Sequence, residues 1–177
     1  MKVNKIIYVI LIVLLCLWVV FSNRIMVEVH GGDIIYKYNE KRSFDDIVVY
    51  SVDLPEYIGG RFEEIYFSGW SFCETESDNS GKRVGIIIED ENKDNNYYCE
   101  TIPGDRLDVK STMETQGYKI KGSNHGFAFK FSAINIKNGK YRLYLYDVEN
   151  DENSGLVDLN IYMIKQKRGN VIFEYIE

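Results

Sequence analysis

The sequence has little of what metal, redox and nucleic-acid chemistry require. Its 177 residues include only two histidines and three cysteines, which leaves few ligands for a zinc or haem site. Lysine and arginine number 21 against 27 acidic residues, a net charge of -6. Because binding to phosphates needs clustered basic side chains, this balance argues against a nucleic-acid-binding protein. We therefore expect no cofactor and no nucleic-acid partner.

Recognisable catalytic motifs are also missing. The chain has no H-E-x-x-H, no G-x-S-x-G and no glycine-rich phosphate loop, which removes the common zinc-protease, serine-hydrolase and nucleotide-binding classes. We expect a protein that is not an enzyme. A hydrolase that uses two loop carboxylates stays open, since a glycosidase needs only such a pair at a suitable separation.

One long hydrophobic run is present, from Ile6 to Phe21, and Lys2 and Lys5 precede it. The positive charge on its N-terminal side predicts a single-pass membrane anchor with a cytoplasmic N-terminus and an extracytoplasmic C-terminal domain. At about 1.5 Å per residue the run spans roughly 24 Å, and extension to Lys5 and Asn23 approaches the roughly 30 Å of a bilayer core. A cleaved signal peptide, which would give a secreted protein, is the alternative.

Alternation of apolar and polar residues predicts half-buried strands through most of the remaining chain. Phe127, Phe129 and Phe131, for example, share one face of such a run. The runs cover 64–74, 83–89, 127–133, 141–147, 156–164 and 171–176, with weaker ones at 25–29, 34–38 and 47–52. This pattern predicts an all-β fold, a two-sheet antiparallel β-sandwich of immunoglobulin-like or jelly-roll-like type.

The segments between the runs carry turn and helix signals. Asn138-Gly139 is typical of a tight hairpin, because both of its central residues favour positive φ. A short helix is expected over 108–114, capped by Asp108 or by a Ser111–Glu114 box. We divide the chain into an anchor at 1–23, a connecting segment at 24–45 and a sandwich domain at 46–177.

Four short motifs follow one another along the chain: Gly69-Trp70-Ser71-Phe72, Arg106-Leu107-Asp108-Val109, Gly126-Phe127-Ala128-Phe129 and Gly139-Lys140-Tyr141-Arg142-Leu143. Their order resembles an uncharacterised extracytoplasmic β-sandwich module of bacterial surface proteins, found beside some cell-surface glycosyltransferases. The resemblance covers about residues 48–165. It implies a β-sandwich at the cell surface and implies no established activity.

Two groups of residues are candidates for ligand binding. Trp70 is a candidate sugar-stacking platform, although a mid-strand tryptophan beside a glycine is more often a core residue, the interpretation we favour. Arg106 and Asp108 either contact a ligand or form an ion pair that fixes a loop and caps the helix. We favour the ion pair.

The second group lies on one predicted strand. Arg142, Tyr144 and Tyr146 alternate and therefore share a face, which could bind a glycan or a partner protein. The alternative is an ordinary outward face, or a face that another element covers.

Two acidic runs resemble parts of calcium loops. Asp90 and Asp94 belong to one run, and Asp147 and Asp151 belong to the other. Both runs lack the glycine and glutamate that an EF-hand loop has at its sixth and twelfth positions. We interpret them as solvated hairpin tips and expect no metal site, with weak calcium binding as the alternative.

Cys73 and Cys99 both fall in the exported part, where a disulfide is chemically permitted. A meander of the strands 64–74, 83–89 and 96–102 would hold them roughly 10 Å apart, beyond the about 7 Å that a disulfide tolerates. A bond between two sheets would avoid this difficulty, so the pairing stays open.

Together these features predict a membrane-anchored, extracytoplasmic, non-catalytic binding or accessory module. Its expected partner is a cell-envelope glycan or a surface protein. A structural or assembly subunit of a membrane complex, which pairs through the N-terminal helix with another membrane protein, is the second hypothesis.

Overall fold

The computed structural model describes residues 7–18, 35–37, 47–60, 62–73, 82–92, 95–148, 154–167 and 169–176. The chain forms two compact units, Met1–Gly32 and Asp33–Glu177. In the first unit, residues 7–18 form a helix whose large apolar side chains are all exposed, from 47% at Leu17 to 70% at Trp18. Within the described residues, no helix is long and apolar enough to cross a membrane. The weak strand expected at 25–29 lies outside the described residues.

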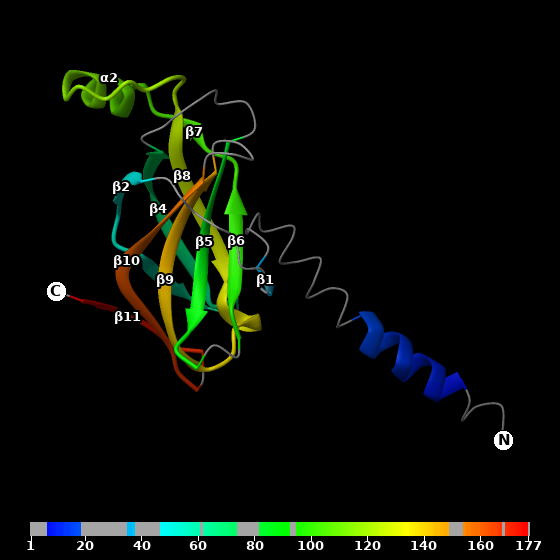
Figure 1. Ribbon diagram of the computed structural model, residues 1–177. Coiled ribbons are helices and arrows are strands. Elements are labelled where there is room, and N and C mark those ends of the chain that lie inside the picture. Colours follow the sequence, from blue (N-terminus) through cyan, green and yellow to red (C-terminus); the bar gives the residue numbers. More distant parts are fainter. Residues whose placement is uncertain are drawn as a thin grey trace. The chain divides into compact units, whose positions relative to one another are not determined.

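The second unit is a two-sheet antiparallel β-sandwich (Figure 1). Sheet A has the order β1 (Tyr36–Lys37), β6 (Tyr97–Thr101), β5 (Arg83–Asp90), β9 (Gly139–Val148), β10 (Ser154–Lys165) and β11 (Val171–Tyr175). Sheet B has the order β2 (Val48–Val52), β4 (Glu64–Cys73), β8 (Asn124–Ser132) and β7 (Gly104–Asp105), and β3 (Glu56–Gly59) also pairs with β4. The predicted sandwich is therefore confirmed.

The chain passes from sheet B to sheet A twice, in the same manner. It passes from β4 in sheet B to β5 in sheet A, and again from β8 in sheet B to β9 in sheet A. β4 pairs with β8, with Ile65 opposite Phe131, and β5 pairs with β9, with Ile86 opposite Leu145. The four central strands of the sandwich are thus two pairs that are distant in sequence.

The alternating apolar residues of both sheets form one core. Phe67, Phe127 and Phe129 pack together with ring centroids 5.4–6.3 Å apart. Ile86 and Leu145 of sheet A belong to the same buried cluster. Truncating a buried phenylalanine such as Phe129, which has no exposed surface, typically costs about 3–5 kcal/mol.

The hairpin expected at Asn138-Gly139 is wrong. β8 and β9 belong to different sheets, and a single 3-10 turn, η1 (Ala133–Asn135), begins the connection between them. Gly139 is the first residue of β9. The Asn138-Gly139 pair favours a tight turn. Ile136 just before it is 2% exposed, and its burial between the sheets places the chain on the path to the other sheet.

Tyr141 fixes this connection. Its hydroxyl donates to the carbonyl oxygen of Lys137 at 2.8 Å, and its ring is only 1% exposed. The ring packs edge-on against Tyr97 at 6.0 Å, and the Tyr97 hydroxyl accepts from the Lys137 amide at 3.2 Å. Burial raises the pKa of Tyr141, so its hydroxyl keeps its proton and remains a donor.

The helix expected at 108–114 is α2 (Leu107–Thr115), which lies at one end of the sandwich (Figure 1). The capping role expected of Asp108 is wrong. Arg106 occupies the N-cap position, and no side chain there makes a capping hydrogen bond. At the other end, the Gly117 amide donates to Glu114 and the Tyr118 amide donates to Met113, the hydrogen bonds of a Schellman motif. Gly117 has a φ of 97°, which favours glycine there.

Candidate functional site

Trp70 lies on the outer face of sheet B, so the interpretation that it fills the core is wrong. The core side of β4 is formed by residues such as Ile65 and Phe67, each 1% exposed, and Trp70 has the opposite parity. It is half-buried and sits between Ser51 of β2 and Gly126 of β8 in the sheet register. The ring is therefore placed on a surface that a ligand can reach.

Arg106 lies on the same face. A Cβ atom on Gly126 would meet the Arg106 Cγ at 2.6 Å, so the aliphatic stem of the arginine occupies the space above this glycine. Because Gly126 and Trp70 are directly paired across the strands, that space is on the Trp70 side of the sheet. Gly126 thus leaves room for the Arg106 side chain beside Trp70. Each of these three residues belongs to a different predicted motif.

Two carboxylates flank the Arg106 guanidinium. Its Nε donates to Asp108 Oδ1 at 2.8 Å and its Nη2 donates to Oδ2 at 2.7 Å. These hydrogen bonds lower the pKa of Asp108 to about 2, and they raise the pKa of Arg106. The charge of Asp53 raises the pKa of Arg106 further, and Asp53 Oδ2 accepts from the Ser68 hydroxyl at 2.7 Å. The ion pair expected between Arg106 and Asp108 is present.

We name this surface the Trp70 face. It consists of Ser51, Asp53, Tyr66, Ser68, Trp70, Arg106, Asp108 and Ala128. Its charged groups are two carboxylates and one guanidinium, so its net charge is negative. The Arg106 and Asp108 side chains are 40% and 66% exposed, and their polar atoms are open to an incoming ligand.

Aromatic packing holds the tryptophan in place. The Trp70 ring stacks on Phe72 with centroids 6.0 Å apart and planes 12° apart. Tyr118 packs edge-on against Phe72 at 5.5 Å, and His125 does so at 5.8 Å. The Schellman motif at the end of α2 places Tyr118 beside Phe72. The Trp70 ring thus packs beside the buried Phe72 ring, which in turn contacts Tyr118 and His125.

The second predicted group lies on the outer face of sheet A and cannot join the first. Arg142 forms an ion pair with Asp158, and its guanidinium lies 5.9 Å from the centre of the Tyr144 ring. Tyr146 is 2% exposed, and its ring occupies the space above Gly85. Tyr146 therefore does not present the exposed ring that the predicted surface-binding role requires.

Of the four calcium candidates, the two that the structure describes, Asp90 and Asp147, do not come together. Asp94 and Asp151 lie outside the described residues. Asp90 is opposite Tyr141 and Asp147 is opposite Val84 in the β5–β9 register, at opposite ends of the sheet and roughly 20 Å apart. Among the described residues, no three His, Cys, Asp or Glu side chains are grouped as metal ligands.

Each of the two described carboxylates has other contacts. Asp90 Oδ1 accepts from the Asn92 amide at 3.1 Å, and Asp90 Oδ2 accepts from the Asn95 side chain at 3.4 Å. Asp90 is also 7% exposed, so it organises the hairpin from inside and is not a solvated tip.

Cys73 and Cys99 are thiols on different sheets, Cys73 on β4 and Cys99 on β6. β4, β5 and β6 do not form the meander considered above, because β4 belongs to sheet B. Both sulfurs are buried, and Cys73 Sγ donates to the Asp147 carbonyl at 3.6 Å.

A buried polar cluster joins the two sheets behind the Trp70 face, and sequence reasoning missed it. We name Ser71, Lys82, His125 and Asp147 the cross-sheet cluster; none is more than 4% exposed. The Ser71 hydroxyl donates to Asp147 Oδ2 at 2.6 Å, and Lys82 Nζ lies 3.3 Å from the same oxygen. Lys82 Nζ also donates to the Ser71 carbonyl at 3.0 Å.

His125 is held uncharged in this cluster. Burial, together with the positive charge of Lys82, lowers its pKa to about 4. Hydrogen bonds to the backbone of Gly122 and Ser71 act in the opposite direction and are outweighed. At neutral pH the imidazole in this cluster therefore carries no charge.

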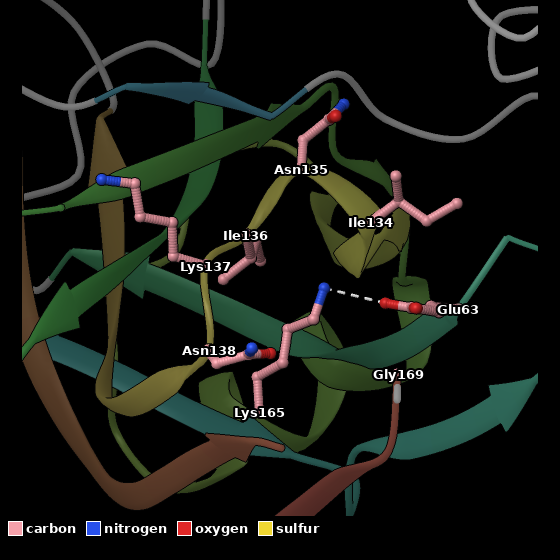
Figure 2. A pocket seen from close by; sticks show the side chains of 8 residues that line it. All are labelled: Glu63, Ile134, Asn135, Ile136, Lys137, Asn138, Lys165 and Gly169. Carbon is pink, nitrogen blue, oxygen red and sulfur yellow. Dashed lines mark ion pairs between the residues drawn. The ribbon is translucent and has the colours of Figure 1, made fainter. Parts of the chain in front are cut away.

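A shallow depression of about 650 Å³ lies at the other end of the sandwich (Figure 2). Lys165 and Glu63 form an ion pair across it at 2.8 Å, and Lys165 Nζ also contacts the Ala133 carbonyl. Asn135 and Asn138 line the same depression. Its residues were not among the candidates from the sequence.

Neither a family model, nor a curated protein, nor a solved structure matches this chain.

Proposed function

We propose that this chain is a membrane-anchored, extracytoplasmic, non-catalytic binding module whose Trp70 face binds a neutral glycan of the cell envelope. The observation that carries the proposal is the meeting of Trp70, Arg106 and Asp108 on one exposed sheet face. An aromatic ring packs on the apolar face of a sugar, while charged and hydroxyl groups beside it bind the sugar hydroxyls.

The charges of the face favour a neutral ligand. Asp108 accepts two hydrogen bonds from Arg106, and the charge of Asp53 acts on the same guanidinium. An anionic polymer would be repelled by these carboxylates and by the net charge of -6. A neutral sugar carries hydroxyls that can donate to the carboxylates and accept from the guanidinium.

The strand order supports an immunoglobulin-like module. Sheet B has the order β2-β4-β8-β7, which corresponds to A-B-E-D, and β6-β5-β9-β10 of sheet A corresponds to C′-C-F-G. Tyr141, near the start of β9, donates its hydroxyl to Lys137 four residues upstream. This matches the tyrosine corner that such domains have before strand F. Many cell-surface domains share this architecture.

The anchor rests on the apolar run from Ile6 to Phe21. Within this run the structure describes residues 7–18, which form a helix and expose their large apolar side chains. Such a surface is unfavourable in water and favourable in lipid or against another apolar helix. The two lysines before the run support a cytoplasmic N-terminus.

Trp70 fluorescence tests the binding proposal. The chain has two tryptophans, so Trp18→Phe in the full chain leaves Trp70 as the only one. This variant is titrated in detergent with neutral and acidic envelope polysaccharides. We expect a neutral polysaccharide to change Trp70 emission and to raise the melting temperature. Trp70→Ala should abolish the shift in melting temperature, and Arg106→Ala should weaken binding about tenfold, the equivalent of about 1.4 kcal/mol.

Tyr144→Ala, on the opposite sheet, is the matched control and should leave the dissociation constant unchanged. If no polysaccharide alters either signal, glycan binding by this face is refuted and a protein partner becomes the favoured ligand. If Tyr144→Ala weakens binding as much as Arg106→Ala, the ligand binds sheet A instead.

A further inference from the structure

The cross-sheet cluster holds an amine and a carboxyl group in contact, away from water. Lys82 Nζ and Asp147 Oδ2 are 3.3 Å apart, and the two side chains are 1% and 0% exposed. Lys82 Nζ also donates to the Ser71 carbonyl, and this hydrogen bond holds the nitrogen beside the carboxyl group. Neighbouring backbone pairs, Val84 with Asp147 and Arg83 with Val148, fix the register that brings the groups together.

We propose that Lys82 and Asp147 become joined by an intramolecular amide bond that links the start of β5 to β9. The Lys82 ammonium first transfers a proton to the Asp147 carboxylate, which leaves an amine and a carboxylic acid. The Nζ lone pair then attacks the Asp147 Cγ, and the C–N bond forms. One Cγ–O bond breaks, and that oxygen leaves as water with the acid proton and one amine proton.

Burial favours both the neutral reactants and the condensation. Two opposite charges that lose their water are costly to maintain, so proton transfer within the pair is less unfavourable here than at a surface. Groups held at contact distance react as if at an effective concentration of about 10⁵ M or more. The site also gives water little access, which opposes hydrolysis of the amide once it has formed.

One neighbour assists the step. The Ser71 hydroxyl donates to Asp147 Oδ2 at 2.6 Å, so it withdraws charge from the carboxyl group and stabilises the oxygen anion that develops on attack.

The Lys165–Glu63 pair provides an internal comparison. Its charged groups lie 2.8 Å apart, but the Glu63 side chain is 22% exposed. Water reaches part of this side chain, so the pair is less closely confined and an amide formed there would be open to hydrolysis. We therefore expect an amide at Lys82 and none at Lys165, although the Lys165 pair is the closer one.

Mass spectrometry of the denatured full chain tests the proposal. The wild-type protein should weigh one water molecule less than its sequence predicts, and Lys82→Arg should restore the full mass. Lys165→Arg is the matched control and should keep the loss. Tryptic digestion should give a branched peptide that contains both Lys82 and Asp147, with no cleavage after Lys82. Ser71→Ala should reduce the linked fraction measured at a fixed time after synthesis.

A wild-type chain of full mass would overturn the proposal and leave Lys82 and Asp147 as an ion pair. So would a water loss located in a linear peptide, because an aspartate that cyclises onto its own backbone loses the same mass. Neither readout depends on glycan binding, so the outcome is separate from that of the Trp70 face.

Discussion

The two ends of the sandwich close the gap between the sheets in different ways. At the α2 end, the cross-sheet cluster places a lysine and an aspartate entirely inside the protein. At the opposite end, Tyr141 bonds to the Lys137 backbone, and Lys165 reaches a glutamate that still contacts water. One end depends on a lysine–aspartate pair without solvent, and the other depends on a neutral tyrosine and on a lysine–glutamate pair whose carboxylate side chain is partly exposed.

This difference predicts which end is more sensitive to change. A buried charge that loses its partner cannot be solvated, whereas a half-exposed carboxylate can. Here Ser71 of β4, in sheet B, bonds to Asp147 of β9, in sheet A. The cross-sheet cluster therefore bridges the two sheets and should dominate the stability.

Removal of the buried carboxylate should have the largest effect. We expect Asp147→Ala to lower the free energy of unfolding by about 3–5 kcal/mol, because it leaves Lys82 charged and buried. Urea denaturation of the full chain measures this. The double variant Lys82→Met with Asp147→Leu should regain the part of this loss that the unpaired charge causes, but not the part that the proposed amide contributes. A cost below about 1 kcal/mol for Asp147→Ala would mean that the α2 end is not the more sensitive one.

Acid should weaken the α2 end next. The pKa of His125 is about 4 when folded, against an ordinary 6.5, so the unfolded chain takes up the proton first. The stability that this difference contributes is complete above pH 6.5 and falls as the pH drops towards 4, by roughly 3 kcal/mol. Urea midpoints at several pH values should show this slope, and His125→Gln should flatten it. An equally steep slope in that variant would assign the loss to other groups.

The smallest effect is expected at the Tyr141 end. Tyr141→Phe keeps the ring and removes the hydrogen bond to the Lys137 carbonyl, at an expected cost of about 1–2 kcal/mol. Tyr144→Phe, on the surface of the same strand, is the control and should change the stability by less than about 0.5 kcal/mol. If Tyr141→Phe costs as much as Asp147→Ala, the two ends are equally important.

Strand positions could be predicted from the sequence because alternation is a local property. The runs at 47–52, 64–74, 83–89, 127–133, 141–147, 156–164 and 171–176 correspond to β2, β4, β5, β8, β9, β10 and β11. The short strands β3 and β7 were not predicted, since four and two residues are too few to show a period. The sheet to which each strand belongs depends on pairing between distant segments, and Asn138-Gly139 was misread for that reason.

The sites could be predicted only in part. The tryptophan and arginine motifs identified Trp70, Arg106 and Asp108 separately, but the sheet register is needed to bring them together. The sequence does contain a signal for the cross-sheet cluster, namely polar residues at inward positions of two strands. Ser71 has the parity of buried Ile65 and Phe67, and Asp147 has the parity of buried Leu143 and Leu145. A polar residue at an inward position implies a partner, although parity alone cannot name Lys82 or His125.

The double crossover also determines how the molecule must acquire its structure. β4 can pair early with β2 and β3, and β5 with β6, but the edges that face β8 and β9 stay open until those strands are available, so neither central pair can form as a local hairpin. Such distant pairings make folding slow, since much of the chain must be gathered before the central contacts are gained. On a ribosome or translocon, β4 and β5 would each emerge with one edge unpaired. Refolding in milliseconds to seconds, with late protection of the β5 amides that bond to β9, is the kinetic consequence of this topology.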